Sequence, residues 1–191
     1  WLGRKKFIHV PASGLKFFRE LFSREGMVSL AKLVPLFIFI ALFWALYDQT
    51  GSSWVLQAEH MNLDFMGMTW LPSQIQAINP ILILLYIPLF TFIVYPLIHK
   101  IFPLTPLRKI GIGMFLVAAS FALIMQIQTW IDAGQRPSVA WQLLAFVIIT
   151  AAEIMISIVG LEFAYTQAPR AMKSWIMSLL WLSVWGGNQF T

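Results

Sequence analysis

The sequence predicts an all-α protein that crosses a membrane several times, and three observations carry this prediction. Apolar residues make up 59% of the chain and charged residues only 11%, whereas soluble domains carry about 25% charged residues. Successive stretches are apolar over the ~20 residues that a helix needs to cross hydrocarbon. The connections between these stretches alternate between strongly basic and nearly neutral, which is typical of a polytopic membrane protein.

The first segment, residues 1–32, holds seven of the thirteen Lys and Arg residues. Its basic run Arg4-Lys5-Lys6 follows Trp1-Leu2-Gly3, a pattern typical of a membrane span that meets a basic interface. We expect this segment to be the end of an earlier span followed by a cytoplasmic connection. Because the last residues, up to Thr191, still lie within an apolar run, we also expect the chain to be part of a longer protein.

The remaining residues, 33–191, are expected to form a bundle of transmembrane helices. The predicted spans run over about 33–58, 73–99, 110–131, 141–168 and, incompletely, 174–191. The second span contains Pro80, Pro88 and Pro96. Interior prolines are tolerated in membrane helices because neighbouring groups satisfy the freed carbonyls, but they bend the helix. The longer spans must tilt or extend beyond the hydrocarbon.

The charges of the connections predict which side of the membrane each one faces. Twelve of the thirteen Lys and Arg residues lie in segments 1–32, 100–109 and 169–173, and the alternate connections, 59–72 and 132–140, hold only Arg136. Basic connections stay in the cytoplasm, so the first set is expected inside and the second outside. Because the basic residues form short runs between apolar spans, the net charge of +5 does not indicate a nucleic-acid-binding face.

Asp48 is the first candidate functional residue, because it lies in the apolar stretch 36–57. A carboxylate at bilayer depth costs at least about 3 kcal/mol unless it faces protein or water. One interpretation is a carboxylate that carries a proton or forms an ion pair in a gate. The other is a carboxylate at a helix end reached by water. Trp44 precedes Asp48 by four residues and shares its helix face, where we expect substrate.

Glu153 is the second candidate, and it lies more than two turns from either end of its span. A low dielectric disfavours the charged form of a carboxyl. This suits proton coupling, or binding of a cationic group. Ser157 follows one turn later on the same face and leaves room for a ligand or for close helix packing. The alternative role for Glu153 is a structural ion pair with a cation elsewhere.

Asn79 is the third candidate, directly before Pro80 in the outer third of the second span. A buried amide must find hydrogen-bond partners. Two interpretations stay open: Asn79 contacts a ligand, or it caps the helical turn that Pro80 disrupts.

The sequence does not indicate an enzyme, a metal site or a bound cofactor. It contains no cysteine, and His9, His60 and His99 fall in interface or loop regions without metal-ligand spacing. No Ser, His and Asp set lies at a common depth that would form a catalytic triad. We therefore expect no catalytic residues.

Five segments together carry a family resemblance: FWALYDQTGSSWVLQ, QIQAINPILI, YPLIHKIFPLTPLRKIGIGMF, AAEIMISIVGLEFAYTQAPRAMKS and the terminal GGN. In this order they resemble the C-terminal half of the proton-dependent oligopeptide transporter family, a branch of the major facilitator superfamily. The resemblance implies that the spans are helices 7 to 10 and part of helix 11. It also implies proton-driven uptake of di- and tripeptides by alternating access, with the proton gradient instead of a cofactor.

The resemblance also implies a role for each candidate residue. Glu153 corresponds to the glutamate of helix 10 that receives the amino terminus of the peptide, assisted by Asn79 and Ser157. Trp44 corresponds to a tryptophan of helix 7 that lines the pocket. Asp48 corresponds to the helix-7 carboxylate that pairs with a basic residue of the N-terminal helical bundle and closes the outer gate.

Three alternatives are weighed against this function. A relative that carries another solute, such as nitrate or a metabolite, is disfavoured because a buried acid repels anions. A non-transporting membrane scaffold would leave Asp48 and Glu153 without a purpose, and an intramembrane enzyme lacks a nucleophile. The expected partners are therefore peptide, protons, lipid bilayer and the N-terminal bundle, without nucleic acid. The short basic connection and the lack of cysteine favour a multi-pass protein of a bacterial inner membrane.

Overall fold

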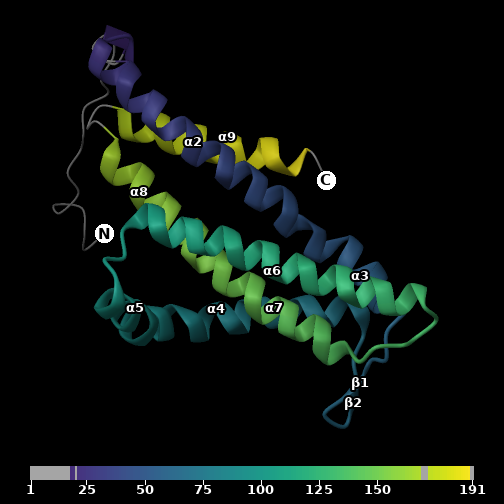
Figure 1. Ribbon diagram of the computed structural model, residues 1–191. Helices are drawn as coiled ribbons and strands as arrows, with labels where there is room; N and C mark the ends of the chain where they lie inside the picture. The colour runs from purple at the N-terminus through teal and green to yellow at the C-terminus, as the bar shows by residue number, and fades with distance from the viewer. Residues whose placement is uncertain (1–17, 20, 169–171, 190–191) are drawn as a thin grey trace, which may run out of the picture.

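The computed structural model describes residues 18–19, 21–168 and 172–189, and these residues are almost entirely helical (Figure 1). Four continuous helical rods are long and apolar enough to cross a membrane. The first rod comprises α2 (Arg24–Tyr47), the turn η1 (Asp48–Gly51) and α3 (Ser53–Ala58); the second comprises η2 (Pro72–Ala77), α4 (Ile78–Leu89), η3 (Phe90–Val94) and α5 (Tyr95–Ile101); the third is α6 (Pro106–Asp132); the fourth comprises α7 (Val139–Glu153), η4 (Ile154–Ile158) and α8 (Val159–Gln167). A shorter helix, α9 (Lys173–Asn188), follows.

Hydroxyl side chains begin three of these helices. Ser23, Thr105 and Ser138 are extended residues whose side-chain oxygens accept hydrogen bonds from the first turns of α2, α6 and α7. These caps satisfy backbone donors that have no partner within the helix. Pro106 occupies the first turn of α6, where the missing N–H removes no helical hydrogen bond.

Three of the rods are interrupted near their middle or outer third. The first rod tightens into a 3-10 turn, η1, at Asp48–Gly51 before the helix resumes. The second rod contains the π-helical segment η3, which lies between Pro88 and Pro96. Each of these prolines removes one backbone donor, which loosens the helical ladder around η3. The fourth rod contains a second π-helical segment, η4, which begins directly after Glu153.

A β-hairpin of two short strands joins the first and second rods. Strand β1 (Asp64–Phe65) pairs antiparallel with β2 (Met68–Thr69). The two residues between them, Met66 and Gly67, both have positive φ values, of 56° and 76°. A tight hairpin turn of this kind requires positive φ at both positions, and glycine adopts it without strain.

The fourth rod lies at the centre of the packing. Of an apolar stretch of 18 residues in this rod, 56% is buried inside the protein, compared with 11% of the corresponding stretch in the second rod. Figure 1 shows α6, α7 and α8 between the α2–α9 pair on one side and α4–α5 on the other. Buried side chains of α2, α6, α8 and α9 form one core, and a second core gathers around Trp54 at the hairpin end. A residue on the inner face of the fourth rod is therefore held by protein rather than by solvent.

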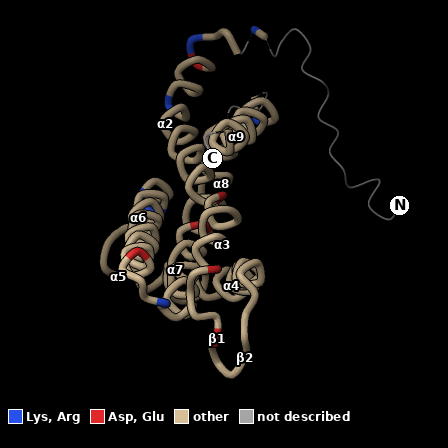
Figure 2. Tube along the Cα trace, turned by 90° about the vertical axis from the view of Figure 1, so that its right-hand side faces the viewer, with Lys and Arg blue, Asp and Glu red and all other residues tan. Residues whose placement is uncertain are grey.

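Charged residues lie mostly near the ends of the rods (Figure 2). The starts of α2, α6 and α9 and the end of α5 carry described basic residues at one end of the molecule: Arg24, Lys32, Lys100, Arg108, Lys109 and Lys173. The opposite end, with the hairpin and the connection after α6, carries Arg136, Asp132, Glu59 and Asp64. The structure thus separates the two sets of connections that the sequence assigns to opposite sides of the membrane.

The helices follow the predicted spans but begin earlier in the chain. The first rod starts at Arg24 rather than near residue 33, and the third starts at Pro106 rather than near 110. These extra turns lie in the basic connections, because helical hydrogen bonding continues beyond the apolar residues that hydropathy detects. Most of the predicted connection 1–32, as well as Arg170, lies outside the described residues.

Candidate functional site

The carboxyl group of Glu153 is the centre of the candidate site. Glu153 is the last residue of α7, it is half-buried, and its Oε2 accepts a hydrogen bond of 2.8 Å from Nδ2 of Asn79. The two residues come from different rods and lie 74 positions apart in the sequence. The packing of α4 against α7 therefore brings together two of the residues that the sequence singled out.

Asn79 is buried, and among the described residues its side-chain amide forms hydrogen bonds across the rods. Besides Glu153, its Nδ2 donates to Oγ1 of Thr150 over 3.0 Å. Neither partner is a backbone group of the turn around Pro80. Of the two interpretations of Asn79, the helix cap is therefore wrong, because the amide is directed at α7 rather than at its own helix.

The aromatic end of α2 approaches the same carboxyl. The hydroxyl of Tyr47 lies within hydrogen-bonding reach of Glu153. Trp44 packs edge-on against Tyr47, with ring centroids 5.3 Å apart. The structure thus places Trp44 next to a direct neighbour of Glu153, and the ring of Tyr47 lies between them in this chain of contacts.

Ser157 lies within the π-helical segment η4. Its Oγ is buried and has no hydrogen-bond partner among the described residues. No hydrogen bond joins it to Glu153 in this part of the chain. A buried hydroxyl without a partner is uncommon in proteins and invites an explanation, such as a bound polar group or water.

Asp48 lies at the junction of α2 and η1, one residue beyond Tyr47. Its backbone carbonyl accepts a hydrogen bond of 3.4 Å from the hydroxyl of Ser52, and its side chain is half-exposed. No basic side chain within the described ranges pairs with its carboxylate. The helix α2 does end here, as the interpretation of Asp48 as a carboxylate at a helix end expected. No loop follows, however, because α3 begins at Ser53 and continues the same rod.

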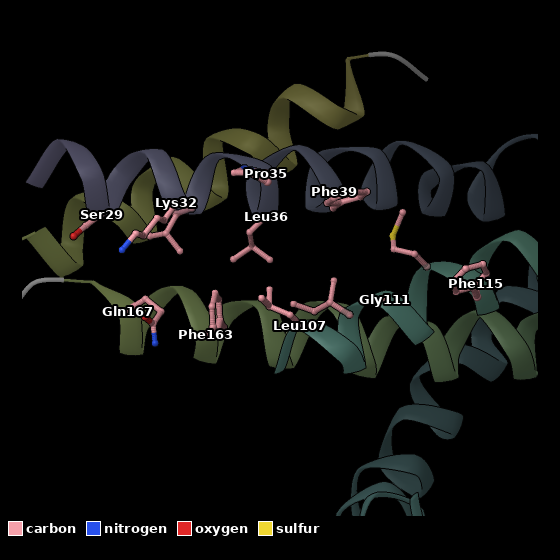
Figure 3. Close-up of a pocket in the computed structure, with 13 residues that line it drawn as sticks. Ser29, Lys32, Pro35, Leu36, Phe39, Leu107, Gly111, Phe115, Phe163 and Gln167 are labelled. Atoms are coloured by element: carbon pink, nitrogen blue, oxygen red, sulfur yellow. The ribbon is translucent and has the colours of Figure 1, made fainter. Parts of the chain in front are cut away.

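A large cavity among the described residues lies elsewhere. It has a volume of about 870 Å³ and opens between α2, α6 and α8 (Figure 3), and neither Glu153 nor Asn79 lines it. Lys32, Ser29 and Gln167 gather at one end, and the rest of the lining is apolar. None of the five candidate residues lines it, and it contains no carboxylate, so it is not suited to bind a cationic group.

Comparison with known proteins identifies the family of this chain. A model described as the POT family matches residues 15–190. The chain belongs to the POT family. Peptide transporter PTR2 of Saccharomyces cerevisiae is 33% identical over 160 residues, which make up 77% of this chain and 26% of that protein.

Solved POT structures share the fold of this chain. The POT family transporter PepTSo matches with a TM-score of 0.78 and 38% identity, over 98% of this chain and 35% of that one. A mutant of a peptide transporter POT in complex with alafosfalin matches with a TM-score of 0.78 and 25% identity, over 92% of this chain and 37% of that one. The chain thus spans much less than the whole length of these POT relatives, and it has the major facilitator fold that was expected.

Two residues of this candidate site were not singled out from the sequence of this POT chain. Thr150 was not considered, although it precedes Glu153 by three residues and so shares its helix face. Tyr47 carries no such signal in the sequence, since aromatic residues in membrane helices mostly serve packing. Spacing on the helix could have found Thr150, whereas the approach of Tyr47 depends on how α2 packs.

Potential metal ligands are not clustered in the described part of this POT chain. No group of three or more His, Asp or Glu side chains is close enough there to hold an ion. The chemistry available at the site is therefore that of a carboxylate, an amide and hydroxyl groups. These groups can accept hydrogen bonds from a cationic or protonated partner.

Proposed function

We propose that this chain is part of a proton-coupled symporter that takes up di- and tripeptides by alternating access. The observation that carries the proposal is Glu153, a carboxyl inside an apolar rod whose described neighbours are an amide and a hydroxyl rather than a cation. Such a group is costly in a membrane unless something positive docks there. A proton and the ammonium group of a peptide are both suitable.

Each candidate residue has a place in this mechanism. Glu153 receives the peptide ammonium together with Asn79, and the unpartnered hydroxyl of Ser157 supplies a further polar contact on the same rod. Trp44 lines the pocket beside Tyr47. Asp48, whose carboxylate has no basic partner in the described residues, pairs with a basic residue of the N-terminal bundle when the outer gate closes.

The transporter acts in the cell membrane together with an N-terminal bundle that this chain does not contain. The share of each relative that the chain covers, 26% for the yeast protein and 35% for PepTSo, supports this view. By name, these relatives are a peptide transporter and a POT family transporter. More specifically, we propose that this membrane is a bacterial inner membrane. The absence of cysteine and the short first connection, residues 1–32, support this proposal.

A relative that carries nitrate or another anion is the second candidate. Glu153 argues against it, because a carboxylate beside the binding position repels an anion. A scaffold without transport activity would retain two carboxyl groups inside the membrane, at a cost of a few kcal/mol each, although neither group would serve a function there.

The decisive experiment measures proton-driven uptake of dialanine by the full-length transporter in liposomes. The substitution Glu153→Gln keeps the shape of the side chain and removes its charge. We expect uptake to fall at least about 10-fold, because a charge-assisted hydrogen bond contributes roughly 1.5–3 kcal/mol. Glu162→Gln is the matched control, since Glu162 lies on the same rod but is exposed. Undiminished uptake by Glu153→Gln would contradict the proposed role.

A further inference from the structure

The side-chain amide of Asn79 is held by two acceptors on one helix. Thr150 and Glu153 lie three residues apart on α7, and this spacing places their side chains on the same face. Nδ2 of Asn79 donates to both of them, over 3.0 Å to Thr150 and 2.8 Å to Glu153. Thr150 is fully buried, whereas Glu153 is only half-buried. The open side of the site is therefore the side of the carboxyl group.

The donor count decides which end of the amide remains free. An asparagine amide has two hydrogens on nitrogen and one acceptor oxygen. An ionised carboxylate only accepts, so the nitrogen must face Glu153. The second hydrogen is taken by Oγ1 of Thr150. Both hydrogens are thus used, and no described residue donates to Oδ1, which remains the free acceptor next to the carboxylate.

We propose that Thr150 is a positioning residue that selects the ammonium end of the substrate by fixing the orientation of the Asn79 amide. With the amide held, the site offers two kinds of oxygen side by side, Oδ1 of Asn79 and the carboxylate of Glu153. An ammonium group has three donors and no acceptor, so it matches this pair, whereas an uncharged acetylated nitrogen does not. This inference rests on the proposed peptide function.

Removal of the Thr150 hydroxyl leaves the hydrogen bond to Glu153 as the one described restraint on the amide, so the amide can turn about that bond. The second hydrogen of Nδ2 then lacks a buried partner, and an amide in that state gains by rotating its hydrogen toward any other acceptor or toward water. Oδ1 leaves its position beside Glu153, and the ammonium loses one of its two contacts. Thr150→Val deletes the hydroxyl at constant shape, and Thr150→Ser restores the hydroxyl while it deletes a methyl group.

The test compares two probes on the purified full-length transporter. Affinity is measured for dialanine, which carries the ammonium, and for N-acetyl-dialanine, which lacks it. For Thr150→Val we expect dialanine affinity to fall about 5- to 10-fold, with N-acetyl-dialanine changed less than about 2-fold. In transport, KM for dialanine rises by the same factor while kcat changes less than about 2-fold. Thr150→Ser should stay within about 2-fold of wild type.

Controls separate this role from general damage and from failure of the proposed function. Thr129→Val removes a hydroxyl whose partner is the backbone of its own helix, α6, so both affinities should remain unchanged. Equal losses for the two probes in Thr150→Val, or no loss for dialanine, would overturn the positioning role while leaving peptide transport intact. If the wild-type protein binds no dialanine, the proposed function fails and this inference fails with it.

Discussion

The two carboxyl groups of the apolar rods occupy different surroundings, and this difference fits the separate roles that we propose for them. Glu153 is held by Asn79 and approached by Tyr47, so its position is determined within the described bundle. Asp48 lies at the open junction of α2 and η1, where no described basic side chain reaches it. A carboxylate that is held fits a binding position, and one without a described partner fits a contact that forms and breaks during gating.

At the residue scale, Asp48→Asn should separate gating from binding. The substitution keeps the size of the side chain and removes the charge that would pair with the N-terminal bundle. We expect the full-length transporter to lose gradient-driven accumulation of dialanine while it retains exchange of dialanine across the membrane, because exchange does not require the empty carrier to reset. Uptake into liposomes with and without internal dialanine measures both activities. Accumulation equal to that of wild type would count against the gating role.

The elements around Glu153 combine close packing with weakened helical segments. The π-helical segments η3 and η4 share one apolar cluster, in which Phe90 packs with Ile154 and Met155. Such π segments are frequent at functional sites. On the other side of η4, Gly113 of α6 is buried against Ile156, which is fully buried in turn. Small residues allow this close approach of helices within a membrane.

At the element scale, Gly113→Ala should destabilise the bundle. A Cβ atom at Gly113 would lie 2.7 Å from Cγ1 of Ile156 and 3.2 Å from the carbonyl oxygen of Ala152. Overpacking of this kind costs about 1–3 kcal/mol, and thermal unfolding in detergent measures it.

Gly111→Ala is the control on the same helix, because nothing lies within 4 Å of its added methyl group. Alanine is the better helix former there, by about 1 kcal/mol, so the unfolding temperature should stay constant or rise. Equal unfolding temperatures for the two variants would show that α6 and η4 do not pack as described.

In the whole molecule, most charged residues lie at the two ends, and apolar rods connect these ends (Figure 2). Described basic residues gather at the end where α2, α6 and α9 begin, and the hairpin end carries Arg136 among acidic residues. Large apolar side chains cover much of the surface between these ends, as Phe92, Leu84 and Phe115 illustrate. This distribution is that of a multi-pass membrane protein, and the basic end is the one that the positive-inside rule predicts to face the cytoplasm.

At the scale of the whole molecule, single cysteines should report this orientation, since the chain contains none of its own. Met66 in the hairpin and Ile101 at the end of α5 are 80% and 83% exposed, so they form a matched pair. In intact cells, a membrane-impermeant maleimide should label Met66→Cys but not Ile101→Cys. Both variants should react after the cells are permeabilised. Labelling of Ile101→Cys from outside would reverse the orientation.

Three features could be predicted from the sequence: the order and approximate extent of the four long apolar helices, the gathering of the described basic residues at one end, and the interior position of Glu153 in its helix. Hydropathy and charge act locally along the chain, so a single sequence suffices to reveal them. The prolines of the second rod likewise predicted that its helix would be disturbed. The sequence also named Glu153 and Asn79 as polar residues inside the spans, but it left the partner of each open.

Only the tertiary structure decided that Asn79 meets Glu153, that Thr150 takes the second hydrogen of the same amide, and that Tyr47 approaches the carboxyl from α2. These contacts depend on the rotation and depth of each helix relative to its neighbours. Rotation and depth are determined by side-chain packing between rods rather than by hydropathy. The sequence by itself therefore determined which groups are costly in the membrane, and the fold decided which of them lie together.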